Sequence, residues 1–441
     1  MNSYPKLINP KRLSQEMLSG TISPVPGYQN RKPCLAVCNE KDMMLLAYHQ
    51  HAEEHAHTNS WWNTSHLVQF CSKDGGYTWT NGKHINFPGN EAQLTMIQGI
   101  LFGTCDKIMA QSVDQGETWT YCDMYKEYVE GKVADPHAGL WCSRVLENPD
   151  GSIFCIAATA GPEDRGYRFR SVDMGKTWEM DEIRMLGGPF FKAHFHCSNF
   201  CEIYPYFTPS GRLMATVRYE PSGVLRTDIP ELYTDDSGSD IDSTMSTALI
   251  ESKDGGLTWE VLRGLGYQSQ HYTSVVYLNE HDFVVTYTVR TSYSKRPWPH
   301  MGVQAVLGRE HEDGSIEVDF DHDIIVLNDK TPDYEVSVNG YGQTQVMPDG
   351  SLITPLSYHM IEDEEHDRMM QLDAIPYEYF EDMSRRIDSR YLVDGKIKSK
   401  ENWDNMTLEW QREFVHVHGQ LLRKEINPTE VVHWRIQINE K

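Results

Sequence analysis

The sequence predicts an all-β protein, a six-bladed β-propeller followed by a short C-terminal extension. The first observation is an eight-residue pattern, Ser-x-Asp-x-Gly-x-Thr-Trp, whose four copies begin at Ser72, Ser112, Ser171 and Ser252. Their starts lie 40, 59 and 81 residues apart, which fits blades of about 40 to 60 residues with an insertion in the longest interval. The second observation is a set of weaker turn sequences between strand-like runs, at Pro149, Pro209, Glu312 and Pro348.

Each copy of the pattern is typical of a hairpin turn that leads into a strand. The Ser and Asp side chains hydrogen-bond turn backbone, the Gly supplies a positive φ, and the Trp packs in the core. We therefore expect the four aspartates to brace turns and to take no part in catalysis. They are Asp74, Asp114, Asp173 and Asp254.

The chain divides into three parts. Residues 1–24 form an N-terminal segment, residues 25–360 the propeller, and residues 361–441 a charged C-terminal extension that closes the propeller or packs on it. The strand-like run VVHWRIQI, from Val431, is expected to pair with the N-terminal blade, because propellers remove their sheet edges by closing. The alternative is that the extension makes a homodimer contact, and the sequence does not decide between them.

Composition argues against several classes of partner and predicts the cellular compartment. A formal charge of −24 argues against a nucleic-acid partner, and no apolar run approaches the roughly 20 residues of a membrane helix. The N-terminus lacks a secretory signal, and nine cysteines without zinc-type pairs suggest reduced thiols, so we expect a cytoplasmic protein. A secreted mature form would read the same way. No cofactor is expected, and an anionic ligand has to be held by a local group of arginines.

Three segments carry candidate site residues. Arg31 and Pro33 stand in NRKPCLAV, and in CEIYPYFTPSGRLMATVR the turn Gly211 lies nine residues after Glu202 and seven before Arg218. In GYGQTQVMPDG, Tyr341 precedes Asp349 by eight. With the four repeats, these spacings resemble the sialidase (neuraminidase) superfamily of Asp-box, or BNR-repeat, β-propellers over about residues 25–360.

The resemblance implies a retaining exo-glycosidase that acts on a glycan with a terminal carboxylated sugar. Tyr341 would be the nucleophile and Glu202 its base, since a neutral phenol avoids the repulsion that a carboxylate nucleophile would meet. Arg31 and Arg218 would supply two of the three arginines that grip the sugar carboxylate. Arg290, within the strand-like VVTYTVR, is preferred over Arg296 as the third.

The chain departs from the family at the acid. The resemblance implies an Asp about two dozen residues after Arg31, but His55 stands there. Glu53 or Glu54 becomes the acid after a slip of one or two residues, or His55 itself donates the proton. This departure leaves open whether the sugar is sialic acid, another ulosonic acid or a uronic acid.

Histidines surround that position. His49, His51, His55 and His57 suit a metal by residue type, but no spacing fixes a geometry, so a polar active-site loop without metal is the preferred interpretation. His194 and His196, shortly before Glu202, are expected to line the same pocket.

Two alternatives to a hydrolase remain. A polysaccharide lyase or uronate-acting enzyme would use Tyr341, His194 or His55 as base, with Arg218 neutralising the carboxylate. A non-catalytic carbohydrate-binding propeller would explain the missing Asp. A lyase product absorbs ultraviolet light and a hydrolase product does not, so product chemistry separates the two enzymes.

Overall fold

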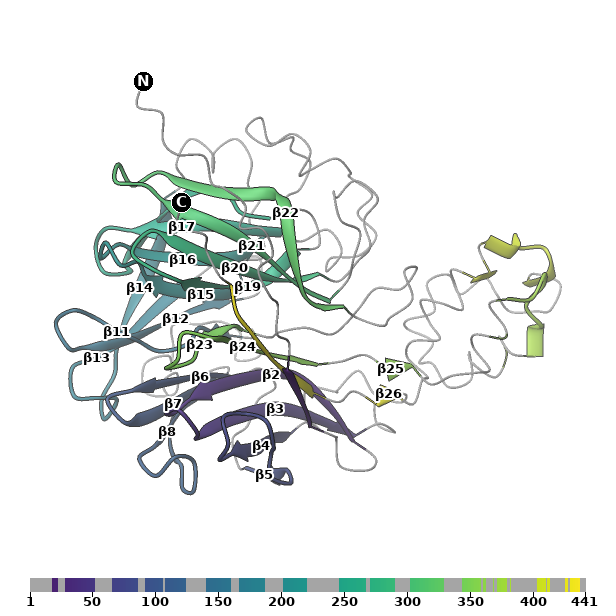
Figure 1. Ribbon diagram of the computed structural model, residues 1–441, viewed down its shortest axis with the longest axis horizontal. Helices are drawn as coiled ribbons and strands as arrows, with labels where there is room; N and C mark the ends of the chain where they lie inside the picture. Colours follow the sequence, from purple (N-terminus) through teal and green to yellow (C-terminus); the bar gives the residue numbers. More distant parts are fainter. Residues whose placement is uncertain are drawn as a thin grey trace.

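The computed structural model describes residues 18–22, 28–51, 66–85, 92–105, 108–123, 140–159, 166–186, 201–219, 246–266, 270–289, 302–328, 343–357, 360–361, 368, 371–378, 381, 403–409, 411–412, 425–426 and 429–436. These residues are mostly strands, and they form six blades around a common axis (Figure 1). The prediction of a six-bladed β-propeller is confirmed.

Blades 1 and 2 are four-stranded antiparallel meanders in chain order from the channel outward. Blade 1 contains β2 (Tyr28–Val37), β3 (Met43–His51), β4 (His66–Ser72) and β5 (Lys83–His84). Blade 2 contains β6 (Ala92–Ile97), β7 (Ile100–Cys105), β8 (Ile108–Ser112) and β9 (Thr120–Asp123).

Blades 3 and 4 join through their outer strands, because β14 and β18 pair in parallel. Blade 3 contains β10 (Leu140–Cys142) and β11 (Leu146–Glu147), which together make its inner strand, then β12 (Ile153–Thr159), β13 (Gly166–Ser171) and β14 (Glu179–Leu186). Blade 4 contains β15 (Cys201–Phe207), β16 (Leu213–Tyr219), β17 (Ser246–Ser252) and β18 (Thr258–Gly264).

The last two blades differ in how the chain builds them. Blade 5 is a simple meander of β19 (Gln270–Tyr277), β20 (Asp282–Val289), β21 (Gly302–Glu310) and β22 (Ile316–Asn328). Blade 6 combines both ends of the chain, in the order β23 (Gln345–Val346), β24 (Leu352–Ser357), β27 (Thr429–Trp434) and β1 (Leu18–Ile22). The expected boundaries at 25 and 360 therefore leave out two strands of this blade.

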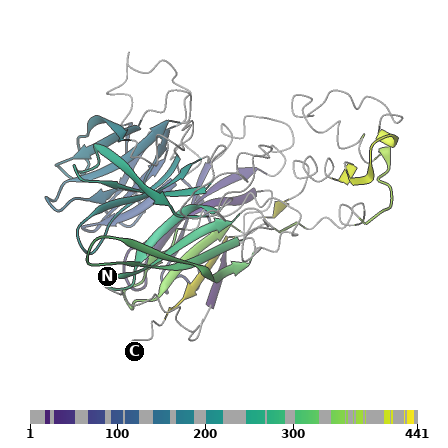
Figure 2. The ribbon, with the colours of Figure 1, turned by 90° about the horizontal axis from the view of Figure 1, so that it is seen from above.

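A separate segment is inserted between the second and third strands of blade 6. It leaves the propeller through a two-stranded ribbon of β25 (Met360–Ile361) and β26 (Glu425–Ile426). Its described helical turns gather around Trp403, which is fully buried and donates a hydrogen bond to the Ile375 carbonyl. Figures 1 and 2 both show these turns apart from the blades.

The four Ser-x-Asp-x-Gly-x-Thr-Trp turns lie between the third and fourth strands of blades 1 to 4, and their hydrogen bonds agree closely. In the first, the Ser72 hydroxyl accepts from Gly76 N at 2.8 Å and donates to Asp74 Oδ1 at 2.9 Å. Asp74 also accepts from the backbone N–H and the hydroxyl of Thr78, at 2.9 and 2.6 Å. The prediction that these aspartates brace turns is confirmed.

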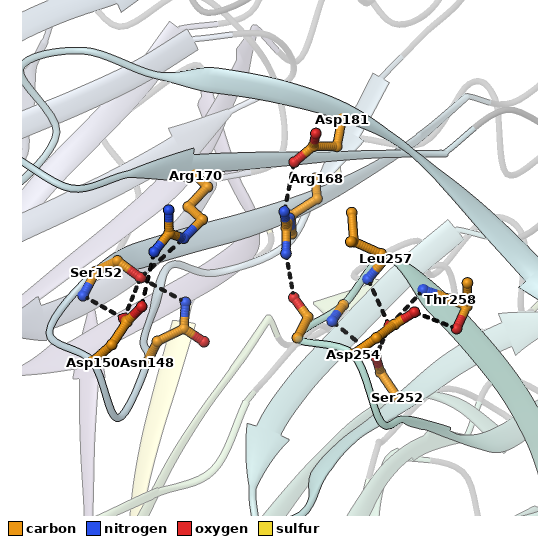
Figure 3. Close-up of polar contacts among 12 residues, drawn as sticks. Asn148, Asp150, Ser152, Arg168, Arg170, Asp181, Ser252, Asp254, Leu257 and Thr258 are labelled. Carbon is orange, nitrogen blue, oxygen red and sulfur yellow. Dashed lines mark hydrogen bonds and ion pairs between the residues drawn. The ribbon is translucent and has the colours of Figure 1, made fainter.

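Each repeated turn is also hydrogen-bonded to the blade before it. A side chain on the third strand of the preceding blade donates to a glycine carbonyl of the turn. The pairs are His433 with Gly75, Gln69 with Gly116, Gln111 with Gly175 and Arg168 with Gly255, over 2.7, 3.0, 2.7 and 2.8 Å. Figure 3 shows Arg168 reaching from Asp181 toward the turn that holds Asp254. The repeat thus fastens neighbouring blades as well as bracing its own turn.

Gly116 shows why this turn requires glycine. Its φ is +88°, and a Cβ there would lie 1.9 Å from Met44 Cε of blade 1. Any other residue would carry both backbone strain and a steric clash with the neighbouring blade.

The two ends of the propeller differ in their connections. One end, the repeat face, carries the repeated turns and the short turns that follow each inner strand, such as residues 208–211. At the other end, the loop face, long stretches of sequence join the strands, including 52–65, 124–139, 187–200 and 220–245. The inner strands of the blades begin at the loop face and end at the repeat face.

Seven cysteines have described side chains, and none of them forms a disulfide bond: Cys34, Cys38, Cys71, Cys105, Cys122, Cys142 and Cys155. Within the described ranges, no helix is long and apolar enough to span a membrane.

Candidate active site

Two of the predicted site residues meet at the loop-face end of the channel. Glu202 stands at the start of the inner strand β15, and Arg218 near the end of β16 beside it. The Arg218 Nη1 to Glu202 Oε1 distance is 2.9 Å, and the two side chains are 10% and 3% exposed. Antiparallel pairing of Cys201 with Arg218 brings Glu202 and Arg218, sixteen positions apart, to the same end of the hairpin. The sequence spacing thus becomes a buried ion pair.

Glu202 occupies a strained backbone position that recurs in two other blades. Its φ is +52°, and Lys32 in β2 and Tyr272 in β19 have φ values of +46° and +51°. All three lie in β-bulges where the pairing register shifts by one residue, between Arg31 and Cys34, Cys201 and Tyr204, and His271 and Ser274. Positive φ at a non-glycine residue costs about 1–3 kcal/mol and clusters at functional sites.

A hydrogen bond crosses the channel at this level. Gln93 Nε2 of β6 donates to the Tyr272 hydroxyl at 2.7 Å, and both residues are buried. Blades 2 and 5 face each other, because two blades separate them on either side of the ring. The Gln93–Tyr272 pair therefore spans the channel and forms a floor beneath the loop-face opening.

Electrostatics connect this floor to the ion pair. Burial raises the pKa of Tyr272 well above its usual range. The charge of Glu202 raises that pKa further, whereas the hydrogen bond from Gln93 opposes the rise. Tyr272 therefore stays a neutral phenol.

For the other predicted site residues, the structure gives at most their position on a strand. Arg31 lies on β2, where it pairs with Tyr48 one residue before the bulge at Lys32. His49 and His51 end β3, at the loop face. The remaining predicted residues lie outside the described residues: Glu53, Glu54, His55, His57, His194, His196, Arg290, Arg296 and Tyr341.

Lys32, Gln93 and Tyr272 are site residues that the sequence did not reveal. The three bulges read Arg-Lys-Pro-Cys, Cys-Glu-Ile-Tyr and His-Tyr-Thr-Ser, and share no residue type at any position. Their likeness lies in register alone. Only an alignment of the blades by strand position would have found them.

The residues with described side chains contain no group of three His, Cys, Asp or Glu that could hold a metal ion. The chemistry available at this end of the channel is that of a buried carboxylate, a guanidinium and a phenol.

The fold was compared with those of solved structures. A protein of unknown function from Dyadobacter fermentans matches with a TM-score of 0.52 at 16% identity, over 77% of this chain and 93% of that one. The leech intramolecular trans-sialidase matches with a TM-score of 0.45 at 12% identity, over 75% of this chain and 64% of that one. Trypanosoma rangeli sialidase matches with a TM-score of 0.45 at 12% identity, over 78% and 58%.

This chain spans less than two thirds of each of the two sialidases. No protein-family model matches the sequence, and no curated protein matches it. At 16% identity, the similarity to the Dyadobacter fermentans protein concerns the fold alone.

Proposed function

We propose that this protein is an exo-glycosidase that removes a terminal carboxylated sugar, sialic acid or a related ulosonic acid, with retention of configuration. The observation that carries the proposal is the buried Glu202–Arg218 pair at the loop-face end of the channel. It combines a general base and a carboxylate-binding cation in one water-poor place. The spacings that resemble the sialidase superfamily supply the other roles.

In the proposed reaction, Arg31, Arg218 and Arg290 hold the sugar carboxylate. The Tyr341 oxygen attacks the anomeric carbon while Glu202 takes the phenol proton, and the glycosidic C–O bond breaks. Glu54 or His55 gives the leaving oxygen its proton, and a water molecule then hydrolyses the sugar–tyrosine bond.

The ion pair suggests how substrate would prepare the base. Without ligand, Arg218 is paired with Glu202. A substrate carboxylate that binds Arg218 competes for that guanidinium and leaves the Glu202 carboxylate available to accept the phenol proton. The floor formed by Gln93 and Tyr272 would limit how deep the sugar enters.

A substrate panel tests the proposal. The full chain is incubated with fluorogenic α-ketosides of N-acetylneuraminic acid and of its deaminated analogue, with uronic-acid glycosides, and with neutral-sugar glycosides as controls. Release from an α-ketoside supports the proposal, and Glu202→Gln should abolish it, whereas Glu117→Gln on the exposed repeat face should not. Products that absorb in the ultraviolet would instead indicate a lyase, and no release from any glycoside would favour a binding protein.

A further inference from the structure

A second opening of the channel lies at the repeat face. A cavity of about 620 Å³ is lined by the last residues of five inner strands and by Arg144 of blade 3. Asn39, Pro209 and Pro348 are exposed at its rim, so it opens to solvent on this side. Its volume is in the range of about 300–1,000 Å³ that small-molecule sites occupy.

This cavity is separate from the candidate active site. On β6 the lining residues Leu94 to Met96 follow Gln93, and on β19 the lining residues Val275 to Tyr277 follow Tyr272. The Gln93–Tyr272 hydrogen bond therefore crosses the channel on the loop-face side of the cavity. A ligand here would approach from the repeat face.

An interruption in blade 3 places Arg144 at the cavity wall. Ser143 lies between β10 and β11, its N–H donates to the Ile156 carbonyl at 2.7 Å, and its hydroxyl accepts from Ile156 N at 3.0 Å. These bonds keep the strand attached to β12 where its regular pairing stops, and Arg144 follows directly.

The Arg144 guanidinium is fixed in orientation. Its carbon lies 4.1 Å from the centre of the Tyr204 ring, and its Nε donates to the Pro205 carbonyl at 3.1 Å. Among the described residues, no acceptor takes a hydrogen bond from either of its Nη groups. Arg144 therefore offers two parallel N–H donors, in the geometry that a carboxylate accepts.

No acidic side chain lines the cavity. Two carboxylates lie behind its wall, and each is paired with a cation. Glu310 accepts from Tyr277 at 3.0 Å and pairs with Arg212 at the same distance. Asp42 accepts from Asn39 at 2.7 Å and pairs with Lys73 at 3.4 Å. In a protein with a formal charge of −24, this cavity is a place of uncompensated positive charge. Such a charge favours an anionic ligand.

The rest of the cavity wall favours a ligand with a ring or an apolar body. Tyr204, Tyr206 and Tyr277 follow one another along it, with ring centroids 6.5 and 6.3 Å apart. Val275, Val276 and Met347 add apolar surface. Aromatic and aliphatic walls bind apolar or ring-shaped bodies, and the few polar groups set their orientation.

We propose that this repeat-face cavity binds a small monocarboxylate with a ring or apolar body, whose carboxylate rests on the two Nη groups of Arg144. The proposal is independent of the glycosidase function, because it uses none of the residues assigned to that reaction. It gives the propeller a second binding site at the opposite end of its channel.

Calorimetry on the full chain tests the proposal, with benzoate as the probe and benzamide as its neutral counterpart. Benzoate should bind and benzamide should not. Arg144→Met should weaken benzoate binding about tenfold to hundredfold, because two charge-assisted hydrogen bonds are lost. Arg144→Lys should bind benzoate with an affinity between those of the wild type and Arg144→Met. It keeps the positive charge but loses the two parallel N–H donors of the guanidinium. Arg170→Met, at an arginine that pairs with Asp150 outside both sites, should leave the affinity unchanged.

Several results would overturn the proposal. They are no binding of benzoate to the wild type, equal binding to Arg144→Met, loss of binding in Arg170→Met, or equal competition by chloride or phosphate, which would mark a site for inorganic anions. A crystal of the wild type soaked in 4-bromobenzoate decides the matter if Arg144→Met fails to fold. The bromine signal should lie beside Tyr204 and Tyr206, and a signal at the loop face alone would refute the site.

Discussion

The repeat face and the loop face of this propeller differ in how the sequence specifies them. At the repeat face, one eight-residue pattern makes one turn four times, and its bonds join residues within four positions of each other. At the loop face, the candidate site gathers Lys32, Gln93, Glu202 and Tyr272 from four different blades. Local bonding produces repetition that can be seen in a sequence, whereas convergence of distant strands produces a site without a common pattern.

The same contrast separates stability from chemistry. The repeated turns satisfy their Ser, Asp and Thr side chains internally, and their glycine carbonyls fasten them to the preceding blade. At the loop face, positive φ values within strands and a buried charge pair both cost free energy. At the repeat face, Gln115 and Met174 also have positive φ, but they lie in turns. Changes at the two faces should therefore have different consequences, and the following experiments measure them.

The largest effect is expected for Tyr341→Phe. Under the proposed function it removes the nucleophilic oxygen, so kcat on an α-ketoside should fall by about 10³-fold or more. KM and the melting temperature should change little. Tyr121→Phe is the matched control, since Tyr121 is 42% exposed beyond the repeated turn of blade 2. Retention of more than a tenth of the activity in Tyr341→Phe would rule out the nucleophile assignment.

Arg218→Met tests the buried pair itself. It leaves Glu202 buried without its cation, which should lower the free energy of unfolding by about 3–5 kcal/mol. The double variant Glu202→Leu with Arg218→Met removes both charges and should recover most of that loss, as urea denaturation would show. If the double variant is less stable than either single variant, the two groups do not act as a pair.

Trp259→Ala and Trp119→Ala probe the repeat face. Trp259 is 1% exposed within a core shared by blades 3, 4 and 5, so its truncation should lower the free energy of unfolding by about 3–5 kcal/mol. Trp119 is only partly buried, and its indole N–H donates to Gln69 of blade 1. Its truncation should therefore lower the free energy of unfolding by less than that of Trp259. Equal costs in urea denaturation would show that the four turns are energetically alike despite their different burial.

The smallest expected effect is the pH dependence of the stability that Asp114 contributes. The hydroxyl and the backbone N–H of Thr118 hold the pKa of Asp114 at about 2, and those of Thr177 do the same for Asp173. A carboxyl group whose pKa is lower in the folded state stabilises the fold above its unfolded pKa, near 4, and loses this contribution as the pH falls toward 2. The stability difference between wild type and Asp114→Asn should therefore shrink between pH 6 and pH 2.5. A difference that is constant over this range would contradict the assigned pKa.

The same contrast explains which parts of the fold and of the candidate site could be predicted from the sequence. The fold was predictable because Ser72, Asp74 and Thr78 bond one another within a single turn, and such a turn leaves a fixed spacing. The approach of Glu202 to Arg218 was predictable because one hairpin links them. Their roles and those of Tyr341, Arg31 and Arg290 stay predictions.

The rest was not predictable for physical reasons. Tyr272 reaches Gln93 across the channel, and the 179 positions between them impose no periodicity. Arg144 faces the repeat-face cavity because a strand stops and resumes around Ser143, which no turn residue signals. The participation of residues 18–22 in blade 6 depends on a partner strand more than 400 residues later.

Blade 6 also sets an order of events during biosynthesis. Its third strand, β27, pairs with β24 on one side and with β1 on the other. A ribosome translates β1 among the first strands, yet β1 has no partner until residues 429–434 emerge. Throughout translation, the nascent chain carries an open seam between blades 5 and 1, with unpaired strand edges of the kind that chaperones protect. The segment around Trp403 is translated just before β27. It must therefore not cover the free edge of β24 when β27 pairs there and closes the ring.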